Sequence, residues 1–334
     1  MKKSFQKSLI GVALIAAGIA AHAGTPGTTN LLFPYVTTTA GAFTFISIVQ
    51  QGGNQTVSRG PSPLHFTYAT KAIGAPNFNT SAAPTQANCT HLDGDAASTP
   101  NDLMQFEMSN RVDVPAAFGD TTSVPKYFPN TAVGSNRQGF LIVNNEPGSS
   151  YGSDAVYQGA RLYGEAHIIN TATGLAVGYS TDDLHTANTV GTAVDFSTAN
   201  GPDAGLPNKV INWFAEPTVL TSFYILPLAS ENQMAFLGGA SAAYQVSDAT
   251  TGLSGSYNNN EQFQSSTATA AIQCLGIVSR ATLLGDLNAD FSARGGWGNF
   301  NRASGSASNS LVYKLETTSA LGASTSFITR APVR

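Results

Sequence analysis

The stretch GDLNADF carries oxygen-bearing side chains at alternate positions, which is the chemistry of a calcium site. Asp286, Asn288 and Asp290 would supply carboxylate and amide oxygens, the ligands that Ca²⁺ prefers in proteins. An EF-hand loop also needs glycine at its sixth position and glutamate at its twelfth, where this chain has Phe291 and Trp297. Calcium bound by these three residues is therefore a hypothesis without a complete motif.

The same stretch also fits a short helix. Leu283, Leu287 and Phe291 follow one another at intervals of four residues, which is the apolar stripe of an amphipathic helix. Ser279 would cap its beginning. On such a helix the aspartates are charges exposed to solvent, and we favour this interpretation over the calcium loop.

A second group of polar residues alternates along RLYGEAH. Arg161, Tyr163, Glu165 and His167 would line one face of a strand, where the carboxylate and the imidazole could act as a general base and its orienting partner. No nucleophile can be assigned beside them. We therefore favour a solvent-facing strand surface with charge pairing between strands.

Hydrolase chemistry has little support in the sequence. The chain lacks the alternation of strand and helix that would place the Gly-x-Ser-x-Gly elbow of a serine hydrolase, and the pair of carboxylates that a glycosidase needs is formed only in the fold. Trp213 and Trp297 are candidate platforms for a sugar ring, the second within the glycine-rich GGWGNFN. The alternative is that such aromatic residues plug the end of a sandwich. No set of residues makes a catalytic case, so we favour a protein that is not an enzyme.

The two cysteines of the chain, Cys89 and Cys274, are predicted to pair in an oxidising compartment. The bond would close a very long loop, for which the chain-entropy model gives about 5 kcal/mol as an upper figure. It would tie early strands to late ones. A metal site that combines Cys89 with His91 is the rival reading, but it lacks the second ligand pair of a zinc site.

The N-terminus has the layout of a cleaved secretory signal over residues 1–23. Three lysines precede an apolar run from Leu9 to Ala20, and Ala21-His22-Ala23 gives a small-x-small ending. The run is shorter than the roughly 20 apolar residues of a membrane-spanning helix. We expect an exported protein, either periplasmic, on the cell surface or secreted, with no transmembrane helix in the mature chain.

The composition limits the partners of this mature chain. Three of the 16 basic residues lie in the leader, so 13 remain against 20 acidic ones, a formal net charge of −7. This charge disfavours nucleic acid and anionic lipid. Charged residues make up 11% of the chain, against roughly 25% in typical soluble domains. A surface of Ser, Thr, Asn, Gln and Gly instead offers neutral hydrogen-bonding groups to polysaccharides, to other envelope proteins or to copies of the chain itself.

Alternation of apolar and polar residues predicts many short strands. Leu64, Phe66 and Tyr68 share one face of a strand, and Met104 and Phe106 share a face of another. Other segments are apolar on both faces and indicate strands buried on both sides: 43–49, 140–143, 220–226 and 271–278. Sustained helical periodicity is nearly absent. The sequence therefore predicts an all-β fold, a β-sandwich that is jelly-roll-like or built as two packed sandwiches.

Long polar stretches separate these strands and are expected to be loops. They cover residues 74–86, 115–135 and 186–208. The stretch 186–208 is a possible boundary between two portions of the exported region 24–334, although the predicted disulfide would cross it.

Three segments of the chain resemble stretches of uncharacterised exported bacterial β-sandwich proteins. They are LLFPYVTTTAGAFTFISIVQQGG, GEAHIINTATGLAVGYST and WFAEPTVLTSFYILPL. The resemblance implies an exported β-sandwich, and it carries no catalytic residues to transfer.

Two functional classes follow from the sequence. The first is a non-catalytic exported component, structural or adhesive, of a bacterial cell surface or periplasm. The second is an extracellular glycan-binding module or glycan hydrolase that uses its loops and tryptophans as platforms. We favour the first class. We expect no cofactor other than the calcium of the hypothesis above.

Overall fold

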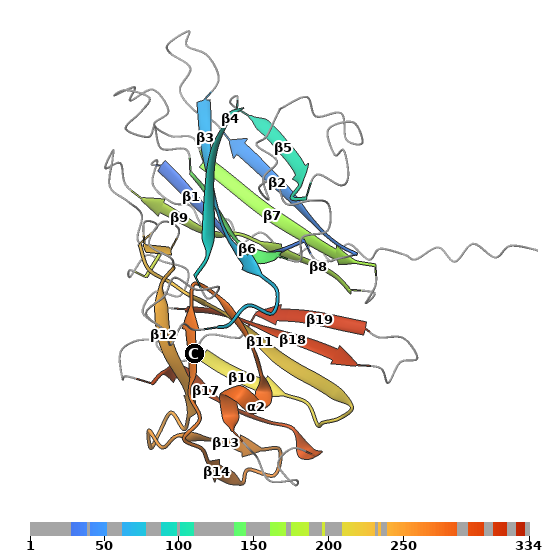
Figure 1. Cartoon of the computed structure of the whole chain (residues 1–334), viewed down its shortest axis with the longest axis vertical. Helices are drawn as coiled ribbons and strands as arrows, with labels where there is room; N and C mark the ends of the chain where they lie inside the picture. Colours follow the sequence, from blue (N-terminus) through green and yellow to red (C-terminus); the bar gives the residue numbers. More distant parts are fainter. Residues whose placement is uncertain are drawn as a thin grey trace, which may run out of the picture.

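A computed structural model describes residues 28–38, 41–51, 62–77, 88–98, 101–109, 137–144, 161–171, 175–186, 196–197, 209–230, 233–234, 239–285, 293–303, 310–318 and 325–330. Regular structure in these ranges is almost entirely β-strand, arranged as four sheets whose strands pair antiparallel (Figure 1). The predicted all-β fold of sandwich type is confirmed.

Strands β1 to β9 form the first two sheets, which we call sheets I and II. Sheet I has the strand order β5 (Asp102–Glu107), β2 (Ala42–Gln51), β7 (Arg161–Asn170) and β8 (Leu175–Ser180). Sheet II has the order β4 (Thr90–Ser98), β3 (Ser62–Ala72), β6 (Arg137–Asn144), β1 (Thr28–Thr37) and β9 (Asp182–Thr186). In Figure 1 they occupy the upper part of the molecule.

Strands β10 to β19 form sheets III and IV in the lower part of Figure 1. Sheet III has the order β16 (Gly276–Ser279), β11 (Val219–Pro227), β18 (Ser310–Thr318) and β19 (Thr325–Arg330). Sheet IV has the order β14 (Phe263–Ser265), β13 (Gly255–Asn258), β17 (Gly296–Arg302), β12 (Ser241–Ser247) and β15 (Ala270–Gln273), and β10 (Lys209–Trp213) pairs with β17. The change from the first pair of sheets to the second falls between β9 and β10; a domain boundary there stays a prediction.

Three hydrophobic cores separate the four sheets. The first core lies between sheets I and II, and includes Phe66 and Met104. The second core lies between sheets III and IV, and includes Phe223 and Phe300. Between them, a shared core joins side chains of sheets II and III, with additional residues of sheet I. Sheets II and III are therefore inner layers with two buried faces, and sheets I and IV are outer layers.

Strand periodicity predicts most of this burial correctly. Leu64, Phe66 and Tyr68 enter the first core, and every residue from 140 to 143 is buried because β6 belongs to an inner sheet. The prediction fails for residues 43–49. There only alternate residues are buried, and Val49 is 40% exposed, because β2 belongs to an outer sheet.

The segment 271–278 is also different from the prediction of one strand. It forms two short strands, β15 and β16, which belong to different sheets. Cys274 separates them with a positive φ of 62°, and its amide donates to the carbonyl of Ala240. Left-handed backbone of this kind cannot continue a strand.

A bulge in β1 brings the first half of the chain into contact with the second. The pairing of β1 with β6 shifts register between Phe33 and Val36, around Pro34, which has no amide hydrogen to donate. The hydroxyl of Tyr224, on β11, donates to the carbonyl of Pro34 over 2.6 Å. The hydroxyl of Tyr179, on β8, donates to the carbonyl of Tyr35. Backbone groups exposed by the bulge thus find partners inside the protein.

A disulfide crosses the shared core, as the sequence predicts. Cys89 precedes β4 of sheet II and Cys274 follows β15 of sheet IV; they are bonded, with Cα atoms 5.8 Å apart and a sequence separation of 185. Both residues are buried in the shared core. The bond therefore fastens the two pairs of sheets to each other.

A buried lysine lies at the same junction. Lys71, at the end of β3, is 2% exposed, and its Nζ donates to the carbonyls of Pro76 at 3.2 Å and Gln273 at 3.4 Å. Burial lowers the pKa of Lys71 to about 8, because the charged ammonium loses its hydration. Asn77 donates to the carbonyl of Ile277 at 3.0 Å, so several polar contacts cross this junction.

The one described α-helix, α2 (Arg280–Leu284), is capped as the sequence predicts. The side chain of Ser279 accepts a hydrogen bond from the amide of Thr282. The helix ends earlier than the stripe of Leu283, Leu287 and Phe291 predicts, because Gly285 follows it with a φ of 74°.

Candidate ligand-binding face

Three aromatic side chains form a row across the outer face of sheet IV. Tyr257 of β13 lies opposite Phe263 of β14 on one side and opposite Trp297 of β17 on the other. The rings of Tyr257 and Trp297 are stacked, with centroids 5.1 Å apart and an interplanar angle of 18°. The rings of Tyr257 and Phe263 are tilted, with centroids 5.2 Å apart. We call these three residues the distal aromatic row.

The row is accessible to solvent and is flanked by a polar side chain. Trp297 is 37% exposed, although large aromatic rings are usually buried. Asn212 of β10 lies opposite Trp297 and is also exposed. Its Oδ1 accepts a hydrogen bond from Lys314 Nζ at 2.7 Å. The row therefore ends beside an oriented carboxamide.

A hydrogen bond fixes the middle ring of the row. Tyr257 donates its hydroxyl to Asp248 Oδ2 at 2.5 Å, and the amide of Thr250 donates to Asp248 Oδ1 at 2.6 Å. The bond raises the pKa of Tyr257 and lowers the pKa of Asp248, because it favours the neutral phenol and the ionised carboxylate. The carboxylate thus holds the ring in one orientation.

The two tryptophans of the chain have opposite environments. Trp297 lies on the outer face of sheet IV, whereas Trp213 is 4% exposed and belongs to the second core. A Cβ atom at Gly296 would lie 2.6 Å from the Trp213 ring, so glycine is what lets that ring pack against β17. The prediction of Trp213 as a ligand platform is thus corrected: it is a core residue behind the row.

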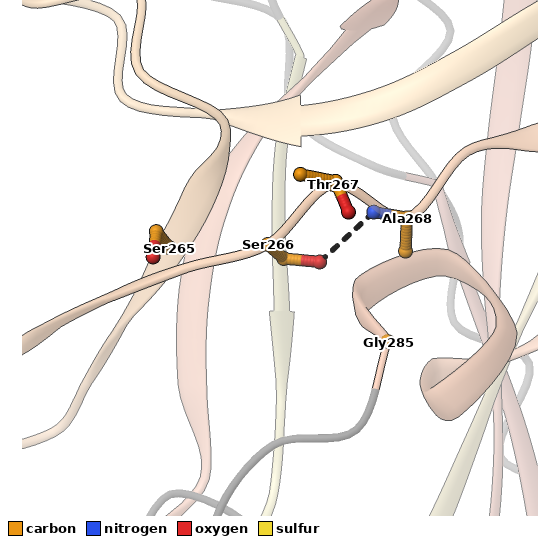
Figure 2. A pocket seen from close by; sticks show the side chains of 5 residues that line it. All are labelled: Ser265, Ser266, Thr267, Ala268 and Gly285. Atoms are coloured by element: carbon orange, nitrogen blue, oxygen red, sulfur yellow. Dashed lines mark hydrogen bonds between the residues drawn. The ribbon is translucent and has the colours of Figure 1, made fainter.

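A hollow lined by hydroxyl groups lies at the end of β14, which carries Phe263. Ser265 follows Phe263 by two residues on β14, so both side chains point to the same face of the sheet. With Ser266, Thr267 and Ala268 it surrounds an open hollow of about 370 Å³, closed on the other side by Gly285 at the end of α2 (Figure 2). Ser266 Oγ accepts a hydrogen bond from the amide of Ala268 at 3.1 Å.

The residues of the calcium hypothesis lie outside the described part of the chain. Asp286, Asn288 and Asp290 fall in the gap between residues 285 and 293. Within the described ranges, no group of three or more His, Cys, Asp or Glu side chains is arranged to hold a metal ion. Calcium binding at those three residues stays a prediction.

The alternating polar residues of β7 lie on the outer face of sheet I. Glu165 and His167 are exposed, and their Oε1 and Nε2 atoms are 3.6 Å apart. Phe45 lies opposite His167 in β2, and the imidazole lies over Gly178 of β8. The surface faces solvent, as the sequence predicts, but Glu165 and His167 belong to the same strand, so their contact is not the predicted charge pairing between strands.

No family model, no curated protein and no solved structure matches the chain. Among the described residues, no helix has the length and apolar character needed to cross a membrane. The candidate face is thus defined by its own chemistry.

Sequence reasoning finds Trp297 but misses its neighbours. Tyr257 and Phe263 precede it by 40 and 34 positions, and only the pairing of β13 with β17 and β14 brings the three rings together. The turn NNNEQ between Tyr257 and Phe263 was the available signal, since Asn-rich turns between short aromatic strands are typical of a hairpin.

Proposed function

We propose that this chain is a non-catalytic exported protein that serves as a structural or adhesive component of a bacterial cell surface or periplasm. The observation that carries the proposal is the continuous packing of the four sheets. A shared core and the Cys89–Cys274 bond join the two pairs of sheets, so load applied to one pair is passed to the other.

The first and last described strands are not left open for a partner. The first and last strands of the described chain, β1 and β19, are both paired inside the molecule, with β6 and β9 and with β18 respectively. The protein therefore does not need to donate either strand to a partner, and association would use its outer faces.

The outer faces expose apolar side chains. Several large apolar side chains are exposed: Val49, Leu103 and Ile169 on sheet I, Trp297 on sheet IV, and Phe214, Leu220 and Leu253 elsewhere. Exposed apolar side chains surrounded by polar ones are typical of contact surfaces. Copies of the chain and other envelope proteins are the expected partners.

Light scattering on the mature chain, residues 24–334, tests this proposal together with negative-stain images and retention on bacterial cell envelopes. We expect assemblies larger than a dimer, or retention on envelopes that survives washing. A monomer that no envelope preparation retains would contradict the proposal. Release of soluble sugar from the envelopes would contradict its non-catalytic part.

A further inference from the structure

We propose that the distal aromatic row and the hydroxyl-lined hollow beside it form a binding site for a neutral polysaccharide. The inference rests on the proposed function, because it names the ligand through which an adhesive component would attach. It extends the candidate platform at Trp297 to a site made from three strands and the segment that follows them.

The aromatic row matches the apolar side of a sugar. Pyranose rings carry C–H groups on their faces, and these pack against the face of an indole or a phenol. Tyr257 stacks on one face of the Trp297 indole, so the opposite face is the one that a sugar ring can contact. Trp297 is 37% exposed, which leaves that contact open to a ligand.

The platform is rigid before any ligand arrives. Tyr257 is held by its hydrogen bond to Asp248 and by rings on both sides, and Trp213 packs behind the strand that carries Trp297. A preformed site loses less conformational entropy on binding than a flexible one.

The hollow matches the hydroxyl groups of a sugar. Its lining consists of Ser265, Ser266 and Thr267 with two small residues, so hydroxyl groups dominate its polar surface. A hydroxyl that accepts a hydrogen bond, as Ser266 does, still carries a proton that it can donate. Its volume of about 370 Å³ is within the range of small-ligand sites. An aromatic face together with hydroxyl groups matches the apolar and polar sides of a saccharide.

Charge selects a neutral ligand. The carboxylate of Asp248 accepts a hydrogen bond from Tyr257 of the row, and the chain carries a formal net charge of −4 even with its basic leader. Both repel acidic polysaccharides and phosphorylated ligands.

Affinity gel electrophoresis tests the site. The mature chain runs in gels containing dextran, galactomannan or hydroxyethyl cellulose, with alginate as an acidic comparison. We expect retardation by at least one neutral polymer, and about a tenfold loss of affinity in Trp297→Ala, the scale of one aromatic stacking contact. Phe43→Ala is the matched control, since it removes a half-buried aromatic side chain from the outer face of sheet I. It should leave retardation unchanged.

Tryptophan fluorescence gives a second readout in the unmutated protein. The chain has two tryptophans, and Trp213 is buried, so a change in emission on adding the retarding polymer reports Trp297. No retardation by any of the three neutral polymers, or equal retardation of wild type and Trp297→Ala, would overturn the inference. Light scattering and envelope retention do not depend on these polymers, so the proposed function can hold even when this inference fails.

Discussion

A tyrosine hydroxyl donates a hydrogen bond both in the shared core and in the distal aromatic row, but the two rings differ in their exposure to solvent. In the shared core, Tyr224 is fully buried beside Tyr35, and its hydroxyl donates to a backbone carbonyl freed by the bulge in β1. In sheet IV, the hydroxyl of Tyr257 donates to the carboxylate of Asp248, which leaves its ring on the surface.

The pKa shifts of the two tyrosines have the same direction and different causes. Burial raises the pKa of Tyr224 well above its usual value, whereas the hydrogen bond to Asp248 raises the pKa of Tyr257. A raised pKa therefore accompanies both a buried tyrosine of the core and a tyrosine on the surface of sheet IV, and it does not by itself distinguish them. Side chains of the centre hold the molecule together, and those of the distal row are available to a ligand.

Loss of the disulfide in the shared core should cause the largest loss of stability. We expect the double variant Cys89→Ser, Cys274→Ser to lose about 4 kcal/mol of unfolding free energy, because the bond closes a very long loop in the unfolded chain. Urea unfolding of wild type and variant measures the difference. Equal stability would show that the shared core holds the two pairs of sheets without the bond.

Two leucines of β11 have the same side chain but differ in burial. Leu226 is fully buried in the shared core, and Leu220 is 58% exposed. We expect Leu226→Ala to cost about 3 kcal/mol through lost burial and the cavity it leaves. Leu220→Ala should cost about 0.5 kcal/mol or less. Similar losses at both sites, measured by chemical denaturation, would contradict the layer order.

Titration of Lys71 should make stability depend on pH. Its pKa is about 8 in the folded protein against 10.5 normally, so between these values the unfolded chain holds a proton that the folded one lacks. The free energy of unfolding should therefore rise, by about 2 kcal/mol, as pH increases from 8 to 10. Above pH 10, buried Tyr224 resists ionisation and stability should fall again.

Replacement of Lys71 isolates its contribution to this dependence. We expect Lys71→Met to remove the rise between pH 8 and 10 while it leaves the fall above pH 10, in denaturation curves collected at each pH. A rise of unchanged size in the variant would assign it to another group.

The smallest effect on stability should come from the distal row. We expect Trp297→Ala to cost about 1 kcal/mol or less, because the ring is partly exposed and loses one stacking partner. A loss above 3 kcal/mol in thermal or chemical unfolding would indicate that Trp297 is a structural residue, and it would erase the contrast with the centre.

Local patterns in the sequence predict much of the fold. The alternation of Leu64, Phe66 and Tyr68 predicts the buried face of β3, and Ser279 predicts the start of α2, because both signals depend on nearby residues. The cysteines predict their own bond because the chain has no others.

Features that depend on distant residues were not predictable in the same way. Residues 43–49 include two polar side chains and 140–143 include none, yet both segments are largely apolar, and the order of the sheets decides which one is covered on both sides. Trp213 and Trp297 are equally plausible platforms in the sequence, and their opposite faces follow from the pairing of β10 with β17. The distal row requires the pairing of Tyr257 with Trp297, which is 40 positions away in the sequence.

The shared core and the disulfide make one body of the two pairs of sheets. Both tryptophans lie in sheet IV, so their fluorescence follows the second pair, whereas far-ultraviolet circular dichroism follows all strands. Equilibrium unfolding of residues 24–334 in urea, with the disulfide oxidised and both probes recorded, tests whether the two pairs unfold together. We predict coincident single transitions. Separate midpoints for the two probes would show that the pairs of sheets unfold independently and would contradict this description.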